Sequence, residues 1–375
     1  WGERVRGRSR TISYPENITI APNADTYDER LRLYFVAMTR AKRQLFLTYA
    51  RADLNGKDTL IASFLTGVNL QPIVHHTPET VAQLTAQAQT AWHDRIIHKP
   101  TASMKALLAP ILEQYKLSAT HLNNFIDISH GGPQGFLMNN LLRFPQAKSA
   151  GASFGTAIHA ALQRAHIHLS ATGERRPAED VIGDFVRELH DQRLNIDEFN
   201  HYAKRGTDAL SKFLHTEYDS FTPAQKAELN FASQGVTLGD ARLTGSLDLV
   251  DINDNHIFVT DYKTGKPSTS WTGRGDYEKI KLHKYRQQLM FYQLLCQHSR
   301  DYASYEFDGA ILQFVEPDSH GNIHSLDQTF STEELTQFAA LIAAVWRCIV
   351  TLELPDASDY SADYKGILQF EKDLI

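Results

Sequence analysis

Residues 226–263 most constrain the fold, because their apolar side chains alternate and are separated by short turns, as in a small antiparallel sheet. The segment Asp251-Ile-Asn-Asp-Asn255 supplies turn residues. We therefore predict a hairpin closed by a two-residue loop at Asp254-Asn255, in which residues whose numbers sum to 509 lie opposite each other. Asp248 would then face Asp261, with their Cα atoms about 4.5–5.5 Å apart.

Two carboxylates held together repel each other, so this arrangement favours a divalent cation that neutralises them. Oxygen ligands suit Mg²⁺ or Mn²⁺ better than zinc. Lys263 lies two residues after Asp261 and should emerge on the same face of the strand. Its amino group could hold a water, deprotonate one in the neutral amine form, or stabilise charge on a phosphorus centre in the charged form. The alternative is that Asp261 and Lys263 form an ordinary charge pair on an exposed strand.

Three further positions join this set by their spacing. His159 lies at the rim of a predicted helix over 155–169, where an imidazole could complete the metal shell or serve only a structural role. Gln288 and Tyr292 are four residues apart and share a helix face; alternatively, the tyrosine packs its ring and the glutamine lies at the surface. Glu228, which precedes an apolar pair, is a weaker candidate carboxylate.

A basic stretch surrounds these positions. Residues 263–286 contain seven basic side chains against two acidic ones, interleaved with Trp271 and Tyr277. Such a stretch could follow a sugar–phosphate backbone and stack bases, or it could be a solvated loop. The basic residues are Lys263, Lys266, Arg274, Lys279, Lys281, Lys284 and Arg286.

Composition excludes several classes of protein. The chain has 375 residues, 42% of them hydrophobic, and a formal net charge of -6, which is typical of a globular protein with two or three domains. Its two cysteines, Cys296 and Cys348, exclude a disulfide scaffold and a four-cysteine metal site. The longest apolar stretch, 338–346, is too short to span a bilayer, and no signal peptide opens the chain, so we expect a cytoplasmic protein and no membrane partner.

The remaining pattern predicts mixed α and β structure. We expect helices that cover about 28–42, 176–220, 281–299 and 332–350, and a helix that Ser118 caps before the Gly-Gly-Pro turn at 131–133. Short strands are predicted at Gln44–Tyr49 and 308–315, and a polar helix or linker at 76–100. The first residue is Trp1, from which we expect a fragment of a longer protein.

His159, Asp248, the Asp261-Tyr-Lys263 triplet and Gln288…Tyr292, in this order, resemble the RecB-type nuclease domain of the PD-(D/E)XK superfamily. Leu117-Ser-Ala-Thr-His-Leu-Asn-Asn-Phe resembles the segment that opens such domains. The resemblance implies an α/β fold, a restriction-endonuclease-like central mixed sheet flanked by helices. It also implies that His159, Asp248 and Asp261 bind metal, that Lys263 is catalytic together with the two aspartates, and that Gln288 and Tyr292 support the site or contact DNA. Some members carry an iron–sulfur cluster, but the expected cysteine near residues 127–136 is absent, so none is implied.

The N-terminal part resembles a different family. Leu33-Tyr-Phe-Val-Ala-Met-Thr-Arg40-Ala-Lys, followed by Leu45-Phe-Leu-Thr-Tyr, is similar to the last motor motif of UvrD-type superfamily 1 helicases. The resemblance implies that Arg40 reaches the ATP γ-phosphate in the full motor, whereas a basic amphipathic helix is the alternative. The chain contains no Gly-x-x-x-x-Gly-Lys-Ser/Thr loop, so we expect no autonomous ATPase and a need for ATP only in the full-length helicase.

Together these patterns predict three parts: a helicase remnant at 1–75, a helical linker at 76–114 and a RecB-like nuclease domain at 115–375. The predicted function is a metal-dependent DNA nuclease, a single-strand exonuclease at the C-terminal end of a helicase–nuclease that processes DNA ends in repair and recombination. Its expected partners are single-stranded DNA, the missing motor domains and other subunits. The alternative is a non-catalytic module that binds DNA or docks a partner on a decayed nuclease fold.

Overall fold

The computed structural model describes residues 26–52, 56–65, 67–68, 104–146 and 148–375 of the chain. The chain divides into two compact units, Trp1–Lys99 and Pro100–Ile375, and each is considered by itself. The predicted polar segment at 76–100 lies outside the described residues. The end of the linker predicted at 76–114 forms helix α3 (Met104–Glu113), whose Leu108 and Leu112 are buried in the main core of the second unit.

The described part of the first unit contains helix α1 (Thr26–Thr39) and a 3-10 turn, η1 (Ser63–Leu65). The helix predicted at 28–42 is confirmed, and Tyr34 packs against Phe64 with ring centroids 5.5 Å apart. The buried strand predicted at Gln44–Tyr49 is wrong: this segment has no regular secondary structure, and Phe46 is 79% exposed. A strand needs a neighbouring strand to satisfy its backbone groups, and the described residues of this unit provide none for this segment.

The second unit is an α/β domain, as predicted. Its helices agree with the sequence pattern, and the hydroxyl of Ser118 caps α4 by accepting a hydrogen bond from His121 N, 3.2 Å away. Helix α11 was not predicted. The helical elements after α3 are α4 (Ala119–Ile126), η2 (Ile128–His130), α5 (Gly132–Phe136), η3 (Leu137–Leu141), α6 (Ala150–Thr172), α7 (Ala178–Asp191), α8 (Ile196–Glu217), η4 (Tyr218–Ser220), α9 (Asp276–Gln297), α10 (Thr332–Thr351) and α11 (Tyr364–Leu374).

A five-stranded mixed sheet forms the centre of this domain, in the order β1-β4-β5-β6-β7. All neighbouring strands are antiparallel except β5 and β6, which are parallel, and β7 was not predicted. A separate two-stranded ribbon pairs β2 with β3. The strands are β1 (Lys226–Asn230), β2 (Thr237–Leu238), β3 (Ala241–Arg242), β4 (Ser246–Asn253), β5 (His256–Lys263), β6 (Glu306–Phe314) and β7 (Ser325–Gln328).

The β4–β5 hairpin has the predicted register. Leu249 pairs with Thr260, and Asn253 pairs with His256, so the connecting loop consists of Asp254 and Asn255. Asp254 has a φ of 51°, in the left-handed region that aspartate tolerates in tight turns. The strand β5 occupies the middle of the sheet, between β4 and β6.

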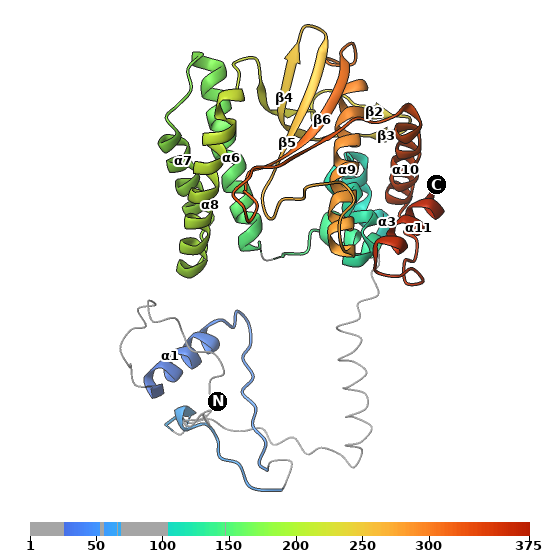
Figure 1. Ribbon diagram of the computed structural model, residues 1–375. Coiled ribbons are helices and arrows are strands. Elements are labelled where there is room, and N and C mark those ends of the chain that lie inside the picture. Colours follow the sequence, from blue (N-terminus) through green and yellow to red (C-terminus); the bar gives the residue numbers. More distant parts are fainter. Residues whose placement is uncertain (1–25, 53–55, 66, 69–103, 147) are drawn as a thin grey trace. The chain divides into compact units, whose positions relative to one another are not determined.

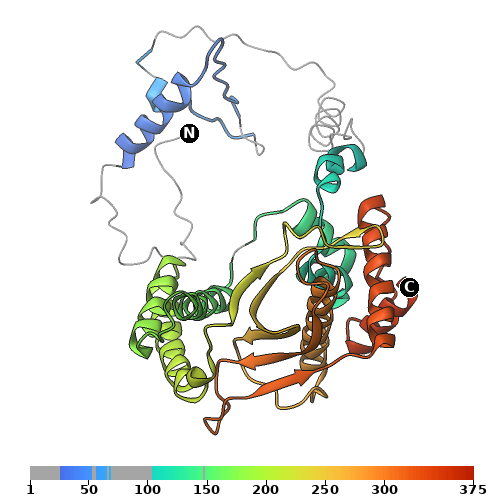
Figure 2. The same ribbon diagram turned by 90° about the horizontal axis from the view of Figure 1, so that it is seen from above.

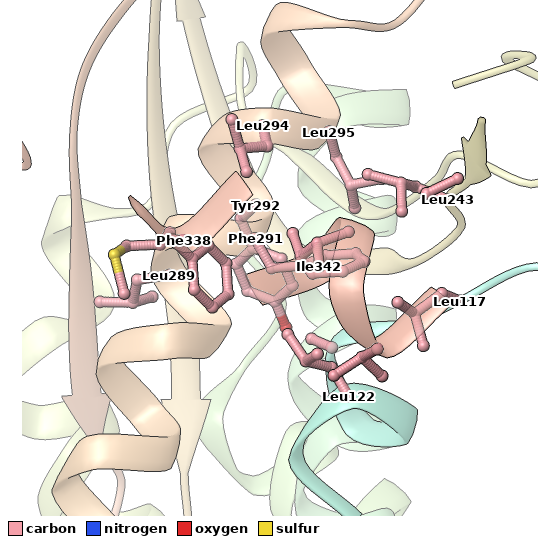
Figure 3. Close-up of a cluster of buried hydrophobic side chains, with 14 of the residues drawn as sticks. Leu117, Leu122, Leu243, Leu289, Phe291, Tyr292, Leu294, Leu295, Phe338 and Ile342 are labelled. Carbon is pink, nitrogen blue, oxygen red and sulfur yellow. The ribbon is translucent and has the colours of Figure 1, made fainter. Parts of the chain in front are cut away.

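Helices cover both faces of the sheet and bury two separate hydrophobic cores. Helices α6, α7 and α8 lie on one side, and α9 and α10 lie on the other, as Figures 1 and 2 show. The larger core joins α9 and α10 to α4 and to the β3 region (Figure 3). The smaller core joins α6, α7 and α8 to Leu249, Tyr262 and Val315 of the sheet region. The sheet therefore separates two apolar layers.

Helix α10 has the length and composition of a membrane span, which within the described part of the chain is true of this helix alone. Its apolar face is packed inside the larger core, where Phe338, Ile342, Val345 and Ile349 are buried. A capping box at its start, between Ser331 and Glu334, fixes its first turn. These contacts are those of a core helix of a globular domain.

Candidate active site

The two aspartates of the hairpin lie at the end of β4 and β5 that is remote from the connecting loop. Continuing the observed register by one position from Leu249 and Thr260 brings Asp248 opposite Asp261. Asp248 Oδ2 accepts a hydrogen bond from Tyr262 N, 2.9 Å away, so the backbone of β5 fixes the Asp248 side chain. Asp261 is buried, with 1% of its surface exposed, whereas the Asp248 side chain is 15% exposed. The pair therefore has one fully buried carboxylate and one that is partly exposed.

Lys263, Gln288, Tyr292 and Asp261 form a closed ring of contacts between β5 and α9. Lys263 Nζ lies 2.7 Å from Asp261 Oδ2 and donates a hydrogen bond to Gln288 Oε1 at 2.8 Å. Gln288 Nε2 donates to the Tyr292 hydroxyl at 2.5 Å, and that hydroxyl donates to Asp261 Oδ1 at 2.9 Å. The four-residue spacing of Gln288 and Tyr292 along α9 makes this possible, because both side chains leave the same helix face.

At both Asp261 and Lys263, burial and the charge of the other residue shift the pKa in opposite directions. Burial raises the pKa of Asp261 above its ordinary value, although the Lys263 ammonium opposes this effect. For Lys263, burial disfavours the charged form, but the Asp261 carboxylate and the Tyr285 hydroxyl group outweigh it and raise the pKa of the amine. The Tyr292 hydroxyl has a pKa well above its ordinary value because of burial and the nearby Asp261. It therefore stays a hydrogen-bond donor at neutral pH.

A second cluster lies beside the ring, where His159 of α6, Glu228 of β1 and Asp248 of β4 bring one ligand atom each within 4.8 Å of one another. His159 Nδ1 lies 3.2 Å from Asp248 Oδ2. Burial lowers the pKa of His159, but the hydrogen bond and charge of Asp248 outweigh burial and raise it overall. Glu228, the weakest of the carboxylate predictions, thus lies in the same cluster as Asp248 and His159.

Glu228 has an unusual backbone conformation. Its φ is 52°, although it lies inside strand β1 between Ala227 and Leu229, which pair with Leu249 and Leu247. A non-glycine residue in the left-handed region costs on the order of 1–3 kcal/mol. Ser246 Oγ donates a hydrogen bond to Glu228 Oε2 at 2.9 Å and holds the side chain beside β4. The strained backbone aims this carboxylate at the cluster.

The donor set fits a divalent metal ion. His159, Glu228 and Asp248 offer one nitrogen and two carboxylate oxygens, a set that Mg²⁺ or Mn²⁺ accepts. Asp261 is not a member of this three-residue group. Its Oδ1 atom accepts a hydrogen bond from the Tyr292 hydroxyl, and its Oδ2 atom forms an ion pair with Lys263 Nζ, 2.7 Å away. Each carboxylate oxygen has a second lone pair with which it could bind a metal.

A surface pocket of about 510 Å³ leads to this cluster. It is lined by residues of α6 and by one carboxylate of β1, namely Gly155, Thr156, His159, Ala160, Gln163 and Glu228. Helix α6 approaches the end of β5 closely at Gly155, where an added Cβ would lie 3.2 Å from Thr264 Oγ1. Because Gly155 has no Cβ, helix α6 can approach the sheet closely and place His159 next to it.

Three of the seven basic side chains in the stretch predicted at 263–286 form ion pairs inside the protein. Lys263 is paired with Asp261, Lys284 with the buried Asp127, and Arg286 with Glu334. The other four basic side chains form no ion pair with the described residues; they are Lys266, Arg274, Lys279 and Lys281. The stretch is therefore neither a uniform DNA-binding ribbon nor a simple solvated loop.

Two residues near the site, Tyr285 and His166, were not predicted from the sequence. The Tyr285 ring lies under Lys263, with Nζ 4.5 Å from the ring centroid, and its position three residues before Gln288 was the available signal. His166 is buried under the sheet, and its Nε2 lies 2.9 Å from the Tyr262 hydroxyl. Since His166 Nδ1 has no hydrogen-bond partner among the described residues, Nε2 is assigned as the protonated nitrogen that donates to Tyr262.

The His166–Tyr262 contact predicts a pH-dependent stability. Burial lowers the pKa of His166 to about 4, from an ordinary value of 6.5. As the pH falls from 6.5 to 4, the unfolded chain takes up this proton and the folded chain does not, so the free energy of unfolding should decrease by about 3 kcal/mol. Chemical denaturation across this range should show that His166→Gln removes this part of the pH dependence. Equal pH slopes in the wild type and His166→Gln would contradict the assignment, and His190→Gln, at an exposed histidine, is the control.

Arg40, the predicted nucleotide-binding residue, follows α1 and is exposed. No nucleotide site is built around it by the described residues of the first unit. The predicted role of Arg40 stays a prediction.

Comparison with known proteins agrees with the geometry. Residues 116–363, well over half of the chain, match the PD-(D/E)XK nuclease superfamily. A search of curated proteins finds no match. The matched region contains the mixed sheet, both aspartates, Lys263 and the helices that carry His159, Gln288 and Tyr292. The chain therefore belongs to the PD-(D/E)XK nuclease superfamily.

Proposed function

We propose that this chain is a divalent-metal-dependent deoxyribonuclease that cleaves single-stranded DNA as an exonuclease. The observation that carries the proposal is that two groups of polar side chains lie next to each other at one end of the β4–β5 hairpin. A three-residue group suited to a metal lies next to a buried aspartate–lysine pair that α9 holds in place. A purely structural charge pair would not need a strained glutamate and a histidine from another layer beside it.

The proposed roles follow from the contacts. His159, Asp248 and Asp261 are the proposed metal ligands, and Glu228 contributes a further carboxylate to the same cluster. Mg²⁺ or Mn²⁺, when bound, would neutralise phosphate charge and activate a water for in-line attack on phosphorus. Lys263 would stabilise the negative charge that develops on the phosphate oxygens. Gln288 and Tyr292 orient Lys263 and Asp261 through the hydrogen bonds described above.

We further propose that the nuclease works at the C-terminal end of a UvrD-type helicase, in DNA-end processing during repair and recombination. The segment from Leu33 to Lys42, with Arg40 next to the helix end, supports this proposal by its sequence resemblance. Several apolar side chains of the first unit are also exposed, including Leu33, Phe35 and Phe46. Such surfaces mark interaction sites, here for the motor domains.

The test is cleavage of end-labelled single-stranded DNA with Mg²⁺ or Mn²⁺. We expect the wild type to shorten the DNA from an end and Asp261→Ala to be inactive, while circular DNA of the same composition resists. Asp251→Ala, which removes an aspartate three residues from Asp248 on the same strand, should remain active. Equal cleavage by wild type and Asp261→Ala would refute the assignment of the site.

The second candidate function is a non-catalytic module that binds DNA or docks a partner. The pairing of Lys263, Lys284 and Arg286 with acids of the same chain favours it, because ion pairs also occur as structural elements. DNA binding without cleavage at any metal concentration would support this candidate. The complete set of two acids, lysine and histidine in one place argues for catalysis instead.

A further inference from the structure

One face of α9 carries polar side chains beyond those of the ring. Lys281, Tyr285, Gln288 and Tyr292 are spaced by four, three and four residues, so their side chains leave the same face of the helix. Gln288 and Tyr292 contact the catalytic lysine and aspartate, and Tyr285 lies under Lys263. Lys281 comes next along this face, about 6 Å from Tyr285 along the helix axis.

Lys281 and Lys263 share the same aromatic ring. Lys263 Nζ lies 4.5 Å from the centroid of the Tyr285 ring, and Lys281 Nζ lies 5.9 Å from it. Lys281 Nζ is also 5.9 Å from the ring of Phe314, which pairs with Lys263 across β5 and β6. Both ammonium groups therefore lie within 6 Å of the centre of one aromatic ring.

Among the described residues, Lys281 has no anionic partner, whereas Lys263 and Lys284 each have one. Its Nζ donates to the Lys266 carbonyl oxygen at 3.2 Å, and no carboxylate of the described residues forms an ion pair with it. Glu278, whose charge acts on Lys281, accepts hydrogen bonds from Ser268 Oγ and Arg274 N. Burial, together with the charge of Lys266, lowers the pKa of Lys281 despite the opposing effect of Glu278. An anion placed here would compensate two adjacent cations.

We propose that Lys281, with Lys266 beside it, binds the phosphate that neighbours the scissile phosphate in the DNA strand. The proposal rests on the proposed nuclease function, since it takes the phosphate beside Lys263 as the one that is cleaved. The contact would position the strand along α9, and it would act in binding, without touching the reacting atoms.

The first test measures affinity for a labelled single-stranded oligonucleotide in the presence of a chelator, over a range of salt concentrations. We expect Lys281→Gln to weaken binding about three- to tenfold and to reduce the slope of log affinity against log salt by about 0.7, the value for one phosphate contact on a single strand. Lys281→Arg should restore both. Lys279→Gln changes the same charge on the same helix but on another face, and it should have a smaller effect.

The second test locates the phosphate. Single neutral methylphosphonate linkages are placed in turn around the cleaved position of the oligonucleotide. At one linkage next to that position, we expect the wild type to lose affinity and Lys281→Gln to lose none, because the contact is already absent. Lys281→Met, which keeps the apolar stem, checks that an effect does not come from lost packing on Tyr285.

The outcomes separate this proposal from the nuclease function. Wild-type cleavage together with unchanged affinity and salt slope in Lys281→Gln would overturn the phosphate site alone. Equal losses in Lys279→Gln and Lys281→Gln, or no linkage that couples to Lys281, would overturn it too. A wild type that cleaves no DNA would refute the nuclease; a linkage anywhere in the oligonucleotide that couples to Lys281 in binding would still support a phosphate contact at Lys281.

Discussion

Replacing Asp248 by Asn is expected to slow DNA cleavage by about 10³-fold, which corresponds to roughly 4 kcal/mol of transition-state stabilisation. Asp248 is the centre of the site: it contacts His159, belongs to the same cluster as Glu228, and is fixed by Tyr262 N. The substitution removes one negative charge from the proposed ligand set but leaves an amide oxygen that can still accept the Tyr262 N–H. Cleavage should therefore be lost while the fold is kept.

The measurement combines cleavage rates with a calorimetric titration of Mg²⁺ or Mn²⁺. We expect the metal affinity of Asp248→Asn to fall along with the rate. Asp251→Asn is the matched control, because Asp251 lies on the same strand and, within the described part of the chain, accepts side-chain hydrogen bonds from Gln225 and Asn253, away from the site. Unchanged metal affinity in Asp248→Asn would contradict the metal assignment even if cleavage were lost.

Replacing Lys263 by Met is expected to lower the free energy of unfolding by about 3–5 kcal/mol at neutral pH. Methionine keeps the apolar stem over Tyr285 but leaves the Asp261 carboxylate buried without its counter-charge. Asp261 is 1% exposed, so solvent cannot compensate for the loss. Chemical denaturation of the whole chain measures the effect.

The double variant Asp261→Asn/Lys263→Met is the control, and it should be more stable than Lys263→Met alone, because no charge is left unpaired. Burial raises the pKa of Asp261, so in Lys263→Met the folded state binds a proton more readily than the unfolded state. The deficit should therefore shrink as the pH falls and grow as it rises through the folded pKa. A deficit that is independent of pH and persists in the double variant would contradict this explanation.

The sequence was most informative where a local rule fixes geometry. The two-residue loop at Asp254-Asn255 sets the hairpin register, and the period of two then determines that Asp261 and Lys263 share a face. The spacing of Gln288 and Tyr292 likewise follows from helix geometry alone. These parts of the fold and site needed no knowledge of distant contacts.

The failures concern features that depend on tertiary packing. Gln44–Tyr49 has strand-like residues, but strand formation needs a partner that its described surroundings do not provide. No sequence pattern indicates the left-handed φ of Glu228. The sequence therefore could not establish that the Glu228 carboxylate lies in the site. Whether Lys284 faces solvent or the buried Asp127 depends on how α4 packs against α9. No spacing rule predicts that.

Because the sheet separates two apolar layers, the geometry of the site depends on the stability of both layers. His159 comes from the layer of α6, whereas Gln288 and Tyr292 come from the layer of α9, and the sheet between them carries the acids. Partial unfolding of either layer would disassemble the site even while the other half kept its native structure. Activity should therefore be lost at a lower temperature than that of global unfolding. The layer that unfolds first sets the highest temperature at which the chain is active.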